Sequence, residues 1–279
     1  MLKSALLSCL LLLSVSALFS QGDGGRDSIG SGRPYRIKKS VDIPLIVGGA
    51  AYTLYGFGQI QNKDGSTLQQ VQDLRESNIN WFDRWAVHPY SKNTDNASYI
   101  PFFVAMPLPL AVFGIDKKMR KDFWQLSSLY AEAMIMTGVL YTSAVHFVNR
   151  YRPLVYRSES PVDTRRSANS RNSFFAGHVA LVATSTFFIA QAYADYHPDS
   201  HCKWLFYTGA GVLTAGTGYL RNKAGEHFPT DIALGTAIGT LSGLLTPALH
   251  RTKLMRNHRL SILPFGGQQS QGLALLYKL

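Results

Sequence analysis

Three short polar clusters hold the side chains of this chain that are suited to chemistry on a phosphate. They are 149–153 (NRYRP), 173–178 (SFFAGH) and 221–231 (RNKAGEHFPTD). Arg152 and Arg221 are permanent cations whose forked donors suit a phosphate or a carboxylate. Gly177 lets a ligand approach the backbone closely, and its N–H lies at the start of a predicted helix, where anions are favoured.

Two histidines and an aspartate complete this set. His178 directly follows Gly177, and His227 lies four residues before Asp231, a spacing that puts both side chains on one helical face. An aspartate beside a histidine fixes the tautomer of the ring and stabilises its charged form. The combination is typical of phosphoryl transfer, in which one histidine attacks phosphorus and the other protonates the leaving oxygen.

The sequence indicates no metal and no other cofactor. It contains no evident carboxylate cluster with metal-ligand spacing. Of the two cysteines, Cys9 lies in a segment that we expect to be removed, so neither an internal disulfide nor a cysteine metal site is predicted. The other histidines fall in predicted loops and tails and receive no role: His88, His197, His201, His250 and His258.

The composition favours a membrane protein. Charged residues make up 16% of the 279 residues, whereas soluble domains carry about 25%. The net charge of +11 could suit nucleic acid. However, the basic residues stand in short groups between apolar runs, as in membrane loops. We therefore expect the lipid bilayer as a partner and no nucleic acid, and the sequence gives no oligomeric state.

Six apolar runs must position the three clusters. They cover 43–60, 100–115, 123–148, 177–194, 204–220 and 230–249. A membrane span needs about 20 mostly apolar residues. The last four runs qualify, whereas the first two are short and Pro107 and Pro109 interrupt the second. We predict an all-α integral membrane bundle of five or six transmembrane helices.

Each cluster lies at the end of an apolar run. Two spans separate the second cluster from the third, so the chain returns to the same side and all three clusters can meet at one membrane face. Within the last run, Gly235, Gly239 and Gly243 recur every four residues, which lets a neighbouring helix approach closely. Glu132, inside the third run, is costly in lipid and should face the bundle interior.

The expected domain organisation follows from the N-terminus. Residues 1–20 resemble a secretory signal peptide, with an uncleaved membrane anchor as the alternative. Residues 21–40 are predicted to be a flexible linker, 41–255 the membrane domain and 256–279 a C-terminal tail. The aromatic stretch 78–90 suits either a membrane interface or a folded loop.

The three clusters resemble the signature of the type 2 phosphatidic acid phosphatase (PAP2) superfamily, in its membrane lipid phosphatase branch. The family pattern is Lys-x6-Arg-Pro, then Pro-Ser-Gly-His, then Ser-Arg-x5-His-x3-Asp. This chain matches it at Arg152-Pro153, at Gly177-His178 and at Arg221, His227 and Asp231. The resemblance covers roughly residues 100–250.

The resemblance implies a metal-independent phosphatase of lipid phosphates. It makes His227 the nucleophile that forms a phosphohistidine, Asp231 the residue that orients it and His178 the general acid. Arg152, Arg221 and the Gly177 N–H would hold the phosphate oxygens. Candidate substrates are phosphatidic acid, phosphatidylglycerol phosphate, an isoprenyl diphosphate and a lipid A phosphate.

Three positions depart from the family pattern. The family lysine falls at Val145, and the two family serines fall at Ala176 and Leu220. A hydrogen bond to a charged group contributes about 1.5–3 kcal/mol, so neighbours must replace these donors. The possible auxiliary residues are Arg150, Lys223 and His146. The alternatives are a catalytically degenerate membrane protein with the same fold and, less favoured, a vanadate-dependent protein like the haloperoxidases of this superfamily.

The charge pattern predicts which side the clusters face. The loop 116–122 and the tail after the last run are basic, so the positive-inside rule places both in the cytoplasm. The three clusters would then face the periplasm or exterior of a bacterial-type inner membrane. A cleaved signal peptide conflicts with this topology, unless run 43–60 or run 100–115 lies in the interface or re-enters, and the sequence leaves that choice open.

Overall fold

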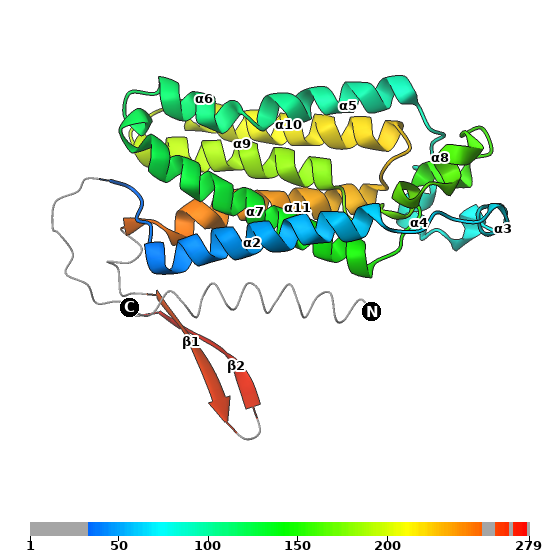
Figure 1. The fold of residues 1–279 in the computed structure, drawn as a ribbon. Helices are drawn as coiled ribbons and strands as arrows, with labels where there is room; N and C mark the ends of the chain where they lie inside the picture. Colours follow the sequence, from blue (N-terminus) through cyan, green and yellow to red (C-terminus); the bar gives the residue numbers. More distant parts are fainter. Residues whose placement is uncertain (1–32, 253–259, 268–269, 278–279) are drawn as a thin grey trace.

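Long helices build most of the structure (Figure 1). The computed structural model describes residues 33–252, 260–267 and 270–277, so the predicted signal peptide lies outside the described residues. The long helices are α2 (Lys39–Gln61), α5 (Lys92–Ala105), α6 (Leu108–Ile115), α7 (Phe123–Phe147), α9 (Gly177–Tyr196), α10 (Lys203–Lys223) and α11 (Pro229–Leu249).

Short helices fill the connections. They are α3 (Leu68–Gln72), η2 (Glu76–Asn78), α4 (Trp81–Arg84), η3 (Met119–Asp122), η4 (Pro153–Tyr156), α8 (Val162–Arg166) and η5 (Ala168–Arg171). Figure 1 shows α3, α4 and α8 together at one end of the bundle. The aromatic stretch 78–90 is therefore part of a folded cap that includes α4.

The long helices run up and down the bundle in alternation. α5 and α6 follow one another and form a single rod, divided where Pro107 and Pro109 remove backbone donors. Residues 149–177 and 221–231 lie at one end, which we call the motif end. Residues 33–38, 116–122 and 250–252 lie at the other, the base end, where Arg33 pairs with Asp122 and Arg36 N–H bonds to the carbonyl of His250.

Glycines set the close packing of α9 on α11. A Cβ added at Gly235 would lie 2.6 Å from the carbonyl oxygen of Ala176, and one at Gly243 would lie 2.7 Å from that of Thr184. Gly239 faces Ala180 in the same way. The expectation that this repeat admits a neighbouring helix is confirmed, and it brings the N-terminus of α9 against the N-terminus of α11.

Hydroxyl groups join α7 to α9 inside the bundle. The Tyr130 and Ser185 side chains lie 2.8 Å apart, as do those of Thr137 and Thr184. Such pairs satisfy polar groups that would otherwise be unpaired in an apolar interior. Around them, apolar side chains such as Leu126, Leu129 and Phe188 are fully buried.

Three helical segments in the described residues are long and apolar enough to cross a membrane: Lys39–Gln61, Lys92–Ile115 and Pro229–Leu249. The two runs that seemed short in the sequence, 43–60 and 100–115, therefore extend into full-length helical segments. α7, α9 and α10 have 25, 20 and 21 residues and lie alongside, although they carry more polar side chains. The predicted fold class, an all-helical membrane bundle, is confirmed.

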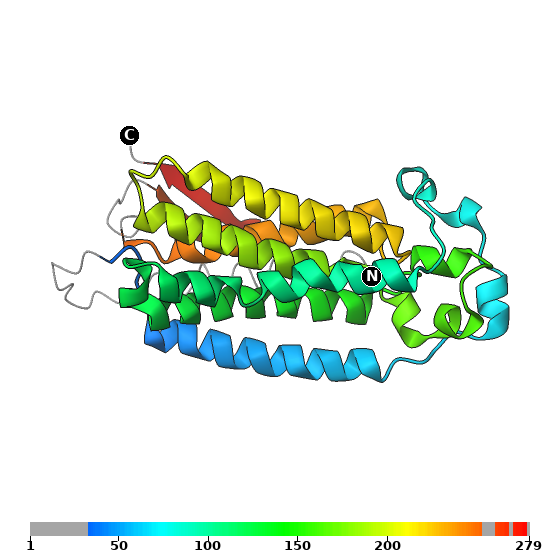
Figure 2. The ribbon, with the colours of Figure 1, turned by 90° about the horizontal axis from the view of Figure 1, so that it is seen from above.

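Exposed tryptophans mark both ends of this bundle. Trp81 in α4 and Trp85 directly after it lie at the motif end, whereas Trp124 and Trp204 lie at the base end. All four are more than 60% exposed. Tryptophan is enriched at the two interfaces of a membrane. Figure 2 shows α2 at one edge of the bundle, and its membrane-length window is only 6% buried, which leaves its apolar surface open to lipid.

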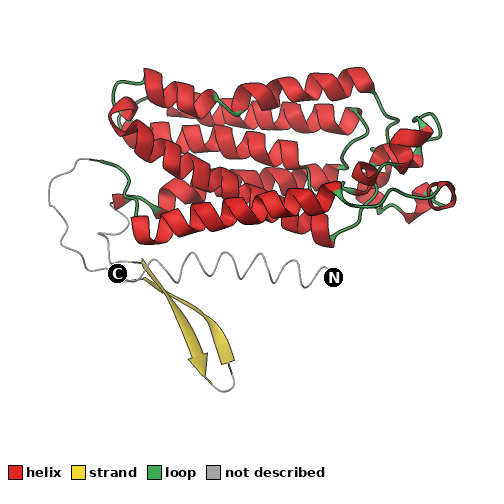
Figure 3. Cartoon of the chain, viewed as in Figure 1, coloured by secondary structure: helices red, strands yellow, loops and turns green. Residues whose placement is uncertain are grey.

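The chain adds a small β-hairpin after the bundle. β1 (Leu260–Gly267) pairs antiparallel with β2 (Ser270–Tyr277), with Leu260 opposite Tyr277. Figure 3 shows these two strands beside the otherwise helical chain. The expected C-terminal tail thus contains regular secondary structure.

Candidate active site

Two buried arginines face one carboxylate at the motif end. Arg152 leads into η4 after α7, Arg221 lies in the last turn of α10, and both are less than 10% exposed. Oε2 of Glu226 pairs with Arg152 and lies 2.8 Å from Nη2 of Arg221. Glu226 is itself buried. The two predicted phosphate-binding residues therefore meet, and an internal anion bridges them.

Further contacts fix the direction of each guanidinium group. Arg221 Nη1 donates to Asp95 at 2.5 Å and to Ser98 at 3.0 Å, both on α5. Arg152 Nη2 donates to the side-chain oxygen of Asn169 at 3.1 Å. The Nε atoms of both arginines are buried without a hydrogen-bond partner. Burial and the neighbouring charge of Arg221 lower the pKa of Arg152 to about 10, so this pair of cations favours an additional anion.

His227 is held by the segment that precedes α9. Its Nδ1 lies 2.8 Å from the carbonyl oxygen of Ser173, which can only accept, so Nδ1 carries the proton and Nε2 is left with a lone pair. Burial and the nearby charges of Arg152 and Arg221 lower the pKa of His227 well below 6.5. A neutral imidazole with a fixed tautomer is a competent nucleophile.

Asp231 is connected to His227 through Ser173. It accepts a 2.6 Å hydrogen bond from the Ser173 hydroxyl and a 3.0 Å bond from the Phe228 N–H. The spacing of His227 and Asp231 suggests a direct pair. Instead, α11 begins at Pro229, so His227 precedes the helix and Ser173 stands between the two side chains.

His178 and Gly177 lie at the first turn of α9. The His178 ring packs edge-on against Tyr99 and Phe102, each with ring centres 4.9 Å away, and both Arg152 and Arg221 act on it electrostatically. A Cβ at Gly177 would lie 2.6 Å from the ring of Tyr141, so only glycine fits there. Because α9 begins at this residue, its N–H belongs to the first turn, whose donors lack intrahelical acceptors.

The three possible auxiliary residues make contacts of their own. Arg150 forms ion pairs with Asp231 and with Asp83, which is fully buried, at 2.6 Å in the latter case. Lys223 is exposed and lies over the ring of Tyr219, 5.9 Å from its centre. His146 is exposed and packs against Phe147.

Asp83 connects the folded cap to the start of α11. Thr230 donates to it from its N–H at 3.0 Å and from its hydroxyl at 2.5 Å. Burial raises the pKa of this carboxyl, but hydrogen bonds from Thr230, Asn80 and Arg150 outweigh that effect and lower it overall. Asp83 thus holds the turn that carries His227. Nothing in the sequence indicates this role, because Asp83 lies in a polar connection.

Lys63 contacts Val145, the residue that stands at the position of the family lysine. Its Nζ donates to the backbone carbonyl of Val145 at 2.6 Å and to the side chains of Asn149 and Asn172 at 3.2 and 3.1 Å. Burial and the nearby charge of Arg171 lower the pKa of Lys63. Asn172 directly precedes Ser173, the anchor of His227. Sequence reasoning missed Lys63 because it lies 82 residues from Val145.

Two comparisons with known proteins found a match, one to a protein family and one to a solved structure. The family model described as the PAP2 superfamily matches residues 127–255, from α7 to just beyond α11. Among curated protein sequences, none matches this chain. A solved structure described as the first transmembrane PAP2 type phosphatidylglycerolphosphate phosphatase from Bacillus subtilis is 21% identical, with a TM-score of 0.43. That similarity covers 77% of this chain and 100% of the other.

The family match spans every residue of the three clusters. The histidines, arginines and aspartate that carry the resemblance also converge at one end of the bundle. Region 127–255 of this membrane protein thus matches the family model of the PAP2 superfamily.

Proposed function

We propose that the motif end is the active site of a metal-independent lipid phosphate phosphatase. The observation that carries the proposal is the convergence of Arg152 and Arg221 on one anion beside His227, whose Nε2 is left free. Arginine forks bind phosphate oxygens, and a neutral histidine attacks phosphorus.

The proposed reaction has two steps. His227 Nε2 attacks phosphorus, and a P–N bond forms as the P–O bond to the lipid breaks. The leaving oxygen takes a proton from His178, whose protonated form is favoured by the negative charge of the bound phosphate. Water then attacks phosphorus, its proton passes to His178, and the P–N bond breaks to release inorganic phosphate.

In this proposal the phosphate of the substrate binds where the Glu226 carboxylate now lies. A phosphate has enough oxygens for the two guanidinium groups, the Gly177 N–H and the unpaired Nε atoms. Glu226 must therefore withdraw from Arg152 when the phosphate binds. The Ser173 hydroxyl and Lys63 act as positioning groups, because they hold Asp231 and the backbone beside His227.

The proposed substrates are membrane lipids that carry a phosphomonoester or a diphosphate. The family match and the membrane helices support this class. Phosphatidic acid, phosphatidylglycerol phosphate, an isoprenyl diphosphate and a lipid A phosphate all present such a group. We also propose that the chain is a multi-pass protein of a bacterial-type inner membrane. Basic residues of the base end, including Lys117, Lys118 and Lys121, favour a cytoplasmic location for that end and a periplasmic location for the active site.

A direct test uses the full-length protein in detergent with a panel of these four lipid classes. We expect phosphate release in the presence of EDTA, with one lipid class preferred. The assay is run well below the temperature at which the protein unfolds, so that a loss of stability in EDTA is not read as a loss of chemistry. If folded protein releases phosphate from none of the lipids, the proposal is wrong.

The second candidate is a degenerate relative that keeps the fold without the chemistry. Two observations favour this candidate. Glu226 pairs with both arginines, and three family positions have lost their polar side chains, at Val145, Ala176 and Leu220. The triple change Val145→Lys, Ala176→Ser and Leu220→Ser distinguishes the candidates. A degenerate protein would gain phosphatase activity, whereas a working enzyme would change little. A haloperoxidase-like protein would instead oxidise halide when vanadate is added.

Lys63→Met is expected to lower kcat/KM roughly 10- to 100-fold, the equivalent of one charged hydrogen bond. Methionine keeps most of the length of the side chain and removes the charged group that holds Val145, Asn149 and Asn172. As a positioning residue, Lys63 should affect kcat more than KM, and Lys63→Arg should recover part of the rate. Unchanged kinetics in Lys63→Met would show that Lys63 does not replace the family lysine.

A further inference from the structure

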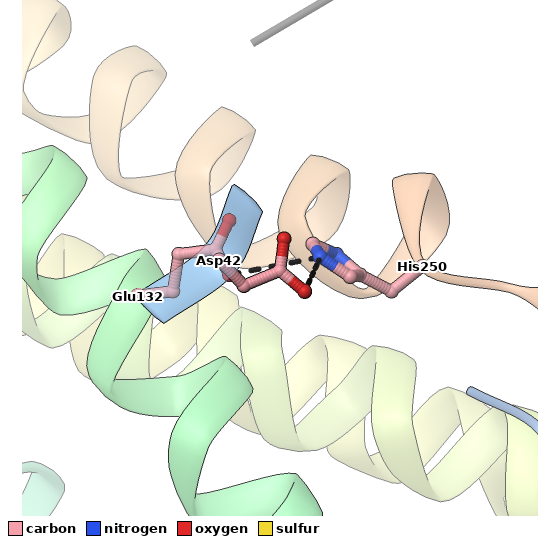
Figure 4. A group of neighbouring side chains, drawn as sticks. All are labelled: Asp42, Glu132 and His250. Atoms are coloured by element: carbon pink, nitrogen blue, oxygen red, sulfur yellow. Dashed lines mark ion pairs between the residues drawn. The ribbon is translucent and has the colours of Figure 1, made fainter. Parts of the chain in front are cut away.

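A cluster of metal-ligand side chains lies away from the motif end, where the base ends of three helices meet. Asp42 comes from the first turn of α2, Glu132 from α7, and His250 directly follows α11. Figure 4 shows the carboxylates of Asp42 and Glu132 on the same side of the imidazole, each joined to it by a dashed line. One ligand atom of each residue lies within 4.8 Å of the other two, and this is the one such group of three among the described residues.

The imidazole of His250 is oriented as in a metal ligand. Its Nδ1 lies 2.7 Å from the carbonyl oxygen of Thr246, so Nδ1 carries the proton and Nε2 is directed at the carboxylates. Histidines that bind metals usually donate their other ring N–H to a carbonyl or carboxylate, which fixes the tautomer and the ring orientation.

The distances between the ligand atoms suit a small divalent ion. Nε2 of His250 lies 3.4 Å from Asp42 Oδ2 and 3.6 Å from Glu132 Oε2. Both distances are long for hydrogen bonds. Tetrahedral zinc with bonds of about 2.0–2.2 Å places neighbouring ligand atoms about 3.3–3.6 Å apart. The imidazole nitrogen is thus spaced from both carboxylate oxygens as if around an ion, and all three ligand atoms lie within 4.8 Å of one another.

A second observation is independent of this spacing. Glu132 Oε2 is completely buried and has no hydrogen-bond partner. A buried carboxylate oxygen without a partner costs free energy, and two carboxylates this close repel each other. A divalent ion would satisfy the unpaired oxygen and neutralise both carboxylates at once.

We propose that Asp42, Glu132 and His250 form a structural site for a divalent ion of the zinc class. The ion would join α2 to α7 and α11 at the base end. α2 contributes few buried residues of its own, namely Asp42 and Gly56, so a bond through Asp42 would hold this edge helix in place. The proposal does not depend on the phosphatase, because the site lies apart from the arginine pair and takes no part in the reaction.

The test uses full-length protein without a histidine tag, stripped with a chelator and then dialysed. We expect it to bind about one Zn²⁺ per chain and to gain thermal stability on titration with Zn²⁺. Co²⁺ in its place should give the visible absorption of a tetrahedral site. Glu132→Gln and His250→Gln should lose both the stability gain and the Co²⁺ spectrum. The loss of either signal in one folded variant is sufficient to support the proposal.

His197→Gln is the matched control. His197 pairs with Asp116 at 3.0 Å in the same part of the bundle, but it faces a single carboxylate. This variant should keep the metal content of the wild type. The proposal is overturned if the wild type binds no Zn²⁺, or if Glu132→Gln and His250→Gln bind as much as the wild type. Asp42, Glu132 and His250 would then form a metal-free ion-pair cluster.

Discussion

His227→Asn is expected to reduce phosphate release by about 10⁴-fold or more, the scale seen when a nucleophile is removed. Asparagine can still donate a hydrogen bond to the Ser173 carbonyl, which His227 contacts at 2.8 Å, so the local backbone should be retained. It has no nitrogen lone pair that can attack phosphorus. The measurement is single-turnover phosphate release from the preferred lipid.

His178→Asn separates the nucleophile from the general acid. We expect this variant to lose about 10²- to 10⁴-fold on a lipid alkyl phosphate, which needs a proton on its leaving oxygen. On p-nitrophenyl phosphate, whose leaving group is acidic, His178→Asn should release the first equivalent of p-nitrophenol at close to the wild-type rate, whereas His227→Asn should not. Equal losses of the two variants on both substrates would contradict the assigned roles.

Detection of the covalent intermediate distinguishes a catalytic role of His227 from a structural one. With the wild type, a rapid quench that avoids acid should yield a phosphorylated peptide containing His227. His178→Asn should accumulate this species from p-nitrophenyl phosphate, because the same residue also accepts the proton of the attacking water. A phosphorylated residue other than His227 would show that the nucleophile lies elsewhere.

The sequence was sufficient to predict how the helices bring the motifs together. Counting two spans between Gly177-His178 and Arg221 places these clusters at one end, and the structure brings Arg152 and Arg221 onto one carboxylate there. The glycine repeat in α11 was also informative, because spacing by four residues on a helix dictates a single contact face. Both inferences depend on helical geometry alone.

Contacts between distant parts of the chain could not be predicted in this way. Lys63 meets Val145, and Asp83 meets Thr230, because the cap that contains α3 and α4 folds over the motif end. Ser173 separates Asp231 from His227 because α11 starts two residues after the histidine. A spacing rule for helices does not apply to a residue that lies outside the helix.

Glu226→Gln is expected to destabilise the protein and to increase its affinity for phosphate. Glutamine has the same shape but lacks the charge that balances Arg152 and Arg221. Breaking a buried ion pair by removing one partner costs about 3–5 kcal/mol. Arg221 keeps Asp95 as a second carboxylate, whereas Glu226 is the one ion-pair partner of Arg152 within the described residues. Most of the loss should therefore come from Arg152.

An added anion should reverse this loss. Orthovanadate or inorganic phosphate can bind where the carboxylate charge is missing, and a ligand that binds only the folded state stabilises it by mass action. We expect the thermal stability of Glu226→Gln to rise steeply with orthovanadate, and its Kd for phosphate to fall at least tenfold below that of the wild type. Thermal unfolding at several anion concentrations measures both quantities.

Glu76→Gln is the matched control for this change. Glu76 pairs with Arg157 at 3.3 Å, but both side chains are about 40% exposed, so their interaction is screened by water. Exposed pairs contribute about 0–1 kcal/mol, and Glu76→Gln should shift neither stability nor phosphate affinity. If Glu226→Gln behaves in the same way, Glu226 does not compete with the substrate. A different outcome is that kcat falls while the affinity for phosphate stays constant. Glu226 would then assist the reaction rather than occupy the phosphate position. In that case the arginine pair must bind the substrate and the carboxylate together.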